Sequence, residues 1–366
     1  MNGVYLKDEE KAIFALRELY QKYGYMPYKM CKFEEYDLYL KNKDFLISDN
    51  IITFTDTDGR LMALKPDVTL SIIKNFTDIK GSVKRVYYNE NVYRASKSTE
   101  NFKEIMQSGL ECIGTIDDYT IYEVVMLAAE SLNIVSSDYV IDISHLGIVS
   151  SIIDAEIQSA EIKKQIVKCI GEKNISELCA IEKRENIDLS KVKELTSTYG
   201  SLSKILPFLN SLSCKDEVEQ LVKIVQTLEK NGYKDKIRID FSIISDMKYY
   251  NGIVFKGFIK GIPSSVLSGG QYDSLMKKMK RTEQAIGFAI YLDMLEFLYE
   301  NTENYDADTL IIYDENTEID VINETVKRFL ETGKSVAVQK SVPENSCFNR
   351  IVKLSKGGVE ILENNA

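Results

Sequence analysis

Apolar and polar positions alternate most clearly between residues 85 and 114, and this alternation predicts two β-strands joined by a polar loop. The first strand carries apolar side chains at strand spacing, at Val86, Tyr88 and Val92. The second strand alternates over residues 105–113. We expect the rest of the chain to be organised around this pair of strands.

One face of the second strand is polar, although the strand is apolar enough to be buried. A period of two places Gln107, Gly109 and Glu111 on that face. A buried acid and a buried amide need polar partners, and the glycine leaves room for one to approach closely. Two interpretations follow: Arg94 pairs with Glu111 across the sheet, or a small ligand with an amine and a carboxylate binds the same residues.

The flanking segments predict further elements of both kinds. Apolar spacing and turn residues indicate a helix at residues 8–24 and a hairpin at residues 51–64. They also indicate a helix at residues 118–132 and a strand at residues 139–144. In the segment LKPDVT, Asp67 follows Pro66 and precedes a short helical pattern. Capping of that helix by Asp67 or Thr69 is the structural explanation for these two residues.

Strand signals return after a long helical stretch. By itself, Asn251-Gly252 between apolar runs has the form of a two-residue hairpin turn. The pair Gly269-Gly270 follows an apolar strand and allows a tight turn or a close backbone approach. Strands on both sides of a helical insertion, followed by a separate α/β tail, predict an α+β fold. The predicted core consists of residues 1–145 and 233–305. The helical insertion is predicted at residues 146–232, and a small α/β domain at residues 306–366.

Composition narrows the class of protein. The 366 residues are enough for two or three domains, and a net charge of -10 without basic clusters argues against a nucleic-acid partner. No apolar run approaches the roughly 20 residues that span a bilayer, so we expect a cytoplasmic protein with no membrane partner. The six cysteines lack C-x-x-C spacing, which indicates reduced thiols. With His145 as the single histidine, a zinc site or a serine-histidine nucleophile system has almost no residues to use, so we expect no metal site and no cofactor.

Four segments carry a family resemblance. In order, LKPDVT, NVYRASKSTENFKEIMQSGLECIG, YYNGIVF and SGGQYD are similar to the catalytic core of histidyl-tRNA synthetase, a class II aminoacyl-tRNA synthetase, and to its paralogue, the regulatory subunit of ATP phosphoribosyltransferase. The similarity covers most of residues 8–300. It implies a class II antiparallel sheet core with a histidine pocket, whose residues are Asp67, Thr69, Arg94, Gln107, Glu111, Tyr249 and Tyr250.

In the resemblance, Asp67 and Thr69 lie near the ligand amine and Arg94 near its carboxylate. Gln107 and Glu111 form the floor of the pocket, and the tyrosine pair surrounds the imidazole. Departures from the synthetase affect mainly the arginines that neutralise carboxylate and phosphate charge during amino-acid activation. The changed positions are Ser245, Lys248, Met294, Asn101, Lys103 and Cys31. Because loss of one preorganised donor costs on the order of 10² to 10³ in rate, we expect negligible adenylation.

A pocket that keeps its amino-acid ligands and loses its ATP-binding arginines favours a sensor. The resemblance therefore implies a non-catalytic regulatory subunit, required for the activity of a short-form ATP phosphoribosyltransferase catalytic subunit and for feedback by histidine at the first step of histidine biosynthesis. The implied partners are that catalytic chain, a second copy in a class II-type dimer, and histidine as effector. The alternatives are a divergent active histidyl-tRNA synthetase, a ligand-free assembly scaffold, and a paralogue that activates another amino acid.

Overall fold

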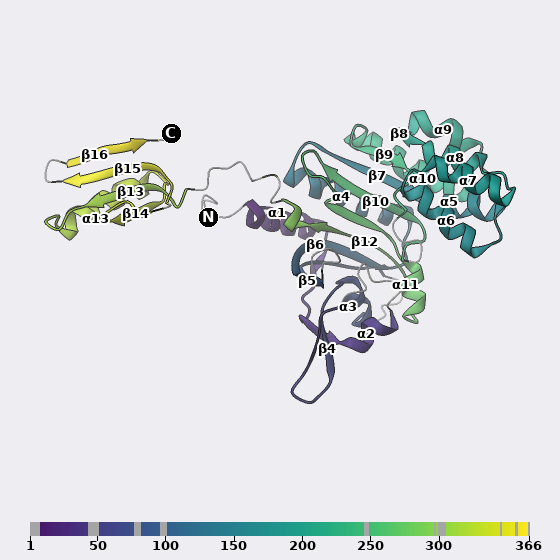
Figure 1. Ribbon diagram of the computed structural model, residues 1–366, viewed down its shortest axis with the longest axis horizontal. Coiled ribbons are helices and arrows are strands. Elements are labelled where there is room, and N and C mark those ends of the chain that lie inside the picture. The colour runs from purple at the N-terminus through teal and green to yellow at the C-terminus, as the bar shows by residue number, and fades with distance from the viewer. Residues whose placement is uncertain are drawn as a thin grey trace. The chain divides into compact units, whose positions relative to one another are not determined.

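The structure is a computed structural model that describes residues 8–42, 51–76, 82–95, 101–244, 249–295, 298, 305–344, 346–355 and 358–364. The chain divides into two compact units (Figure 1). The larger one is Lys7–Leu298, and the smaller one contains Tyr299–Ala366 together with Met1–Leu6. Ser245 and Lys248, two of the positions that differ from the synthetase pattern, lie outside the described residues.

A nine-stranded sheet forms the centre of the larger unit. Its strands, in spatial order, are β1 (Met26–Pro27), β5 (Lys84–Ala95), β6 (Phe102–Gly114), β12 (Gln284–Tyr291), β11 (Leu267–Gln271), β10 (Ile253–Ile259), β7 (Tyr139–His145), β9 (Ile237–Asp240) and β8 (Tyr199–Gly200). Neighbours are antiparallel except for the pairs β1 with β5 and β7 with β9. The predicted α+β class with an antiparallel core is confirmed.

Two helices cover one face of this sheet (Figure 1). They are α1 (Asp8–Lys22) and α4 (Asp118–Val135), both predicted from apolar spacing. Tyr20 of α1 packs against Phe288 of β12, and its hydroxyl bonds that of Ser131 on α4 at 3.0 Å. Asp117 caps α4 by accepting the N–H of Thr120 at 2.8 Å. The opposite face is left for a binding pocket.

Short elements surround the opposite face at its β5–β6 end. The predicted hairpin is present as β3 (Thr53–Thr55) and β4 (Leu61–Leu64), which form a three-stranded sheet with β2 (Phe33–Glu35). The remaining helices here are α2 (Tyr36–Lys41), α3 (Thr69–Lys74) and α11 (Asp273–Lys278). Gly59 has the positive φ, 82°, that the hairpin turn requires.

Helices fill the chain between β7 and β9. They are α5 (Leu146–Glu156), α6 (Ala160–Gly171), α7 (Ile175–Glu185), α8 (Ser190–Ser197), α9 (Leu202–Asn210), α10 (Lys215–Leu228) and the π-helix η3 (Glu229–Tyr233). His145 begins α5 as its cap: Nδ1 accepts the N–H of Gly147 at 3.1 Å, and Nε2 lies 3.0 Å from Gln220 Oε1. Burial lowers the pKa of His145. The cap contact gives the single histidine of the sequence a structural role at the start of α5.

The smaller unit is a separate α/β layer. Its sheet has the order β14-β13-β15-β16, with β13 (Ala307–Tyr313), β14 (Val336–Gln339), β15 (Phe348–Ser355) and β16 (Gly358–Asn364). Helix α13 (Ile319–Glu331) packs on one face through Val326 and Phe329 against buried Ile311 and Val352. A second apolar cluster, Ala307, Leu310, Phe348 and Ile351, is buried as well.

The expected hairpin turn at Asn251-Gly252 is wrong. Strand β10 pairs with β7 and β11, whereas β9 pairs with β7 and β8. Asn251 instead donates its side-chain N–H to Asp273, whose own N–H bonds Asn251 Oδ1 at 2.8 Å. A Cβ at Gly252 would lie 2.2 Å from Gln271 Oε1, so the glycine permits close packing.

Candidate functional site

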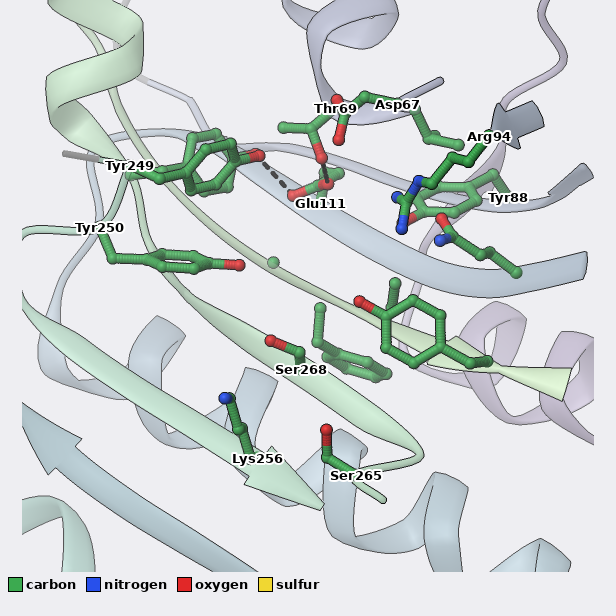
Figure 2. Close-up of a pocket in the computed structure, with 17 residues that line it drawn as sticks. Asp67, Thr69, Tyr88, Arg94, Glu111, Tyr249, Tyr250, Lys256, Ser265 and Ser268 are labelled. Carbon is green, nitrogen blue, oxygen red and sulfur yellow. Dashed lines mark hydrogen bonds between the residues drawn. The ribbon is translucent and has the colours of Figure 1, made fainter. Parts of the chain in front are cut away.

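A cavity of about 350 Å³ lies on the open face of the sheet, which is within the usual size range for small-molecule sites. All seven residues predicted for the ligand pocket line it, although they come from four separated segments of the chain (Figure 2). The sequence missed several further lining residues. The polar ones are Tyr88, Lys256, Ser265, Ser268, Tyr272 and Tyr291.

Small residues keep the floor of the cavity open. In the strand register, Glu111 of β6 is opposite Gly287 of β12, which is opposite Gly270 of β11. A Cβ at Gly287 would lie 1.7 Å from Glu111 Oε2 and 2.5 Å from the Leu110 carbonyl oxygen. The space for a ligand therefore depends on glycines in strands, where close backbone approach is their usual role. Gly269 and Gly270 likewise lie within β11 and form no turn.

Glu111 is the deepest acid of the pocket, with 2% of its surface exposed. Its carboxyl accepts the Thr69 hydroxyl at 2.7 Å and the Tyr272 hydroxyl at 2.5 Å. Burial raises the pKa of Glu111 to about 8, although both hydrogen bonds favour the ionised form. In the free protein this carboxyl is therefore largely protonated at pH 7.

Asp67 lies beside it and has two roles. Its Oδ1 accepts the N–H of Leu70 at 2.9 Å, which ties the carboxylate to the first turn of α3. Burial raises the pKa of Asp67, while that hydrogen bond and the charge of Arg94 lower it. The capping explanation thus describes a contact that exists, and the same side chain also lines the cavity.

The expected pairing of Arg94 with Glu111 is not formed among the described residues. The Arg94 Nε donates instead to the Pro66 carbonyl oxygen at 3.1 Å, and Glu111 is held by two hydroxyls. The interpretation of a purely structural ion pair across the sheet is therefore wrong. Arg94 keeps its charge at the rim, where it can meet a ligand carboxylate.

Aromatic rings close the side of the cavity opposite Arg94 (Figure 2). Tyr249 and Tyr250 lie edge to face, with ring centroids 4.6 Å apart, and Tyr249 also contacts Tyr272 at 5.9 Å. Edge-to-face rings with polar tips suit a flat heteroaromatic group such as imidazole. Tyr272 stands in the quoted SGGQYD segment, so its motif could have identified it.

Three of the positions that lack synthetase arginines can be located, and one of them, Asn101, is exposed just before β6. Met294 lies in the 3₁₀ turn η4 (Leu292–Leu295), where its Sδ lies 3.6 Å from the Ser264 hydroxyl. Lys103 lies on β6 and is exposed. A thioether cannot neutralise a phosphate, so Met294 offers nothing to an ATP phosphate. The described site contains groups that can bind a zwitterion, namely two carboxyls, a guanidinium and several hydroxyls.

An antiparallel sheet with one covered face and one open face that carries a polar pocket is the architecture of class II aminoacyl-tRNA synthetase-like proteins. The family model described as Histidyl-tRNA synthetase matches residues 5–295. A crystal structure of an ATP phosphoribosyltransferase regulatory subunit/histidyl-tRNA synthetase from Bacillus halodurans has a TM-score of 0.78 at 22% identity, covering 94% of this chain and 93% of that one. A chain of the ATP phosphoribosyl transferase (HisG:HisZ) complex from Thermotoga maritima has a TM-score of 0.64 at 20% identity, covering 80% of this chain and 98% of that one.

Curated relatives are similar over most of their length. An ATP phosphoribosyltransferase regulatory subunit of Caldanaerobacter subterraneus subsp. tengcongensis is 31% identical, covering 76% of this chain and 75% of the relative. One of Clostridium kluyveri is 29% identical, covering 81% of each. The chain belongs to the histidyl-tRNA synthetase family, among its ATP phosphoribosyltransferase regulatory subunits. Among the described residues, no helix has the length and apolarity needed to cross a membrane.

Proposed function

We propose that this chain is the non-catalytic regulatory subunit of a cytoplasmic ATP phosphoribosyltransferase and that its pocket binds histidine. It would assemble with the short-form catalytic chain and with a second copy of itself. The observation that carries the proposal is the composition of the pocket, where Asp67, Arg94 and Glu111 remain while Met294 stands at an ATP-binding arginine position. The relatives' names support the assembly, because they are regulatory subunits of that enzyme.

The geometry supports histidine as the ligand. Asp67 and Thr69 are placed to meet its ammonium, Arg94 its carboxylate, and Glu111 and Tyr250 its ring. Each hydrogen bond to a charged group contributes about 1.5 to 3 kcal/mol, so two or three of them select this zwitterion over apolar amino acids. Ligand binding also brings a cation close to Glu111, whose two described hydrogen-bond partners are neutral hydroxyls.

In this proposal, regulation arises because histidine binding in the pocket is thermodynamically linked to assembly with the catalytic chain. Histidine can change the activity of the catalytic chain only by the difference in its affinity for two assembly states. A coupling of about 1 to 3 kcal/mol is usual for such effects. The effector need not contact the catalytic chain for this to occur.

Calorimetric titration of histidine tests the proposal, first into the chain alone and then into its mixture with the catalytic chain. We expect binding that Glu111→Ala abolishes and that Glu104→Gln, an exposed control on the same strand, leaves intact. Histidine-dependent ATP-pyrophosphate exchange should be flat. Exchange above background would identify a divergent synthetase, and absence of binding in both settings would leave an assembly scaffold.

A further inference from the structure

Lys256 brings a positive charge to the part of the pocket farthest from Glu111. It lies on β10, where it is opposite Ser268 of β11 in the strand register, and both side chains line the cavity. Ser265, just before β11, lines the same end. Figure 2 shows the Lys256 ammonium and the two serine hydroxyls pointing into the cavity, toward the side where Glu111 and Thr69 lie.

No hydrogen bond or ion pair of Lys256 is present in the part of the chain that the structure describes. A carboxylate is available, because Asp142 of β7 is directly opposite Lys256 on the other side of β10. The charges that act on Asp142 are instead those of Asp240, Lys173 and Arg238. Lys256 has thus turned from its cross-strand acid into the cavity, and burial lowers its pKa. A part-buried ammonium without a described protein partner, aimed into a cavity, is well placed to bind an anion.

A single free amino acid cannot satisfy both ends of the cavity through its α-carbon groups. In the order β6-β12-β11-β10, β10 is three strands from β6, which places their backbones roughly 14 Å apart at about 4.8 Å per strand. The ammonium and carboxylate of an amino acid are attached to one carbon. When Asp67 and Thr69 hold the ammonium, the carboxylate falls to Arg94 and the ring to Glu111, so Lys256 is left for another group.

We propose that Lys256, Ser265 and Ser268 form an anion subsite that binds a phosphate or carboxylate group. Histidine would then occupy the other end of the cavity, which Asp67 and Glu111 line and which we call the acidic end. This inference rests on the proposed function only for the occupant of the acidic end. The anion belongs either to a second, free ligand or to an extension of a ligand that fills both ends. One ammonium and two hydroxyls match the acceptor oxygens of either group. The subsite makes the regulatory pocket responsive to two chemical signals.

Titration with inorganic phosphate, followed by calorimetry and by thermal unfolding of the full chain, tests the subsite. We expect Lys256→Gln to weaken phosphate binding about ten- to hundredfold, which corresponds to one lost charge-assisted hydrogen bond. Lys260→Gln is the matched control, because Lys260 lies next to the same strand and is exposed with a surface partner, Asp138. Ser265→Ala should weaken binding while Ser264→Ala, at an exposed neighbour, should not. Lys256→Gln should melt no lower than wild type, which shows that it folds.

Whether phosphate and histidine bind together or compete identifies the source of the anion. Additive stabilisation by the two supports a separate ligand in the subsite. Competition that Lys256→Gln removes supports an anionic group on one ligand that spans the cavity. Two results would overturn the subsite. One is equal phosphate binding by wild type and Lys256→Gln. The other is no phosphate binding by wild type, together with a histidine affinity that Lys256→Gln leaves unchanged. Lys256-dependent phosphate binding without histidine binding would refute the proposed function and leave the subsite standing.

Discussion

At Glu111, burial and hydrogen bonding act on the same carboxyl in opposite directions. The folded pKa of about 8 lies above the ordinary value of 4.5, so the folded protein binds an extra proton between these two pH values. The stability that this group contributes is therefore complete below about pH 4.5 and is lost as the pH rises to about 8. Above about pH 4.5, burial of the Glu111 carboxyl therefore lowers the free energy of unfolding of the free protein, and ligand binding offsets this loss.

Glu111→Gln should stabilise the free protein at high pH. Gln keeps an acceptor for Thr69 and removes the buried charge, so we expect a gain of about 1 to 3 kcal/mol in the free energy of unfolding at pH 9 and little change at pH 5. Urea unfolding at the two pH values measures it, with Glu104→Gln as an exposed control. A variant less stable than wild type at both values would show that the carboxyl is structural. Histidine should no longer raise its melting temperature.

Single residues of the site could be predicted where the chain places them on one strand or in one motif. Gln107 and Glu111 follow from the period of two in β6, and Asp67 and Arg94 from their segments. Lys256 could not be found, because it reaches the pocket through the pairing of β10 with β11 and of β11 with β12. Alternation shows which face a residue occupies within its strand, and tertiary pairing decides which faces coincide.

At the scale of elements, helix α3 starts at the wall of the cavity. Asp67 is both the acceptor for Leu70 in its first turn and a wall of the cavity. The sequence offered capping and ligand binding as alternatives, and the structure places one side chain where it both bonds the first turn of the helix and lines the cavity. The helix therefore presents its first turn, and with it Thr69, to the cavity.

Substitutions of Asp67 can separate the two roles. Asp67→Asn retains the acceptor and should keep the free energy of unfolding within about 0.5 kcal/mol of wild type, whereas Asp67→Ala should lose about 0.5 to 2 kcal/mol. Both should weaken histidine binding at least tenfold, because both remove the charge. Chemical denaturation and calorimetry on the same samples measure the two quantities. Unchanged histidine affinity in Asp67→Asn would make the residue a cap alone.

Local signals identified most elements and misassigned one connection. The hairpin around Gly59 formed because the strands beside it pair with each other. Asn251-Gly252 has an equally strong local signature, yet its side chain bonds Asp273 and its strand joins β7 and β11. Pairing across more than a hundred residues overrides a turn preference of this size.

On the scale of the whole molecule, the α+β arrangement was predictable, whereas the order of strands was not. Strands β12, β11 and β10 lie between β6 and β7 in space, although β7 directly follows β6 and α4 in the chain. The sheet is complete only when the segment after the helices α5–α10 is inserted. No periodicity within one segment contains that information.

The two compact units allow a test of independence. Every residue that lines the pocket lies within Lys7–Leu298, and the smaller unit has its own buried apolar clusters. A chain of residues 7–298 should therefore fold and bind histidine within about threefold of the full chain, by circular dichroism and calorimetry. A folded fragment that no longer binds would show that the smaller unit acts on the pocket.

His145, the cap of α5, also affects how the protein is made. It is the only histidine among these 366 residues, so their translation needs one molecule of the charged tRNA for that amino acid. Its codon follows those for Asp67, Arg94 and Glu111 and precedes those for β10, β11 and β12. A ribosome that waits there during histidine starvation holds a nascent chain with the acidic end of the pocket translated and the lysine end still unread.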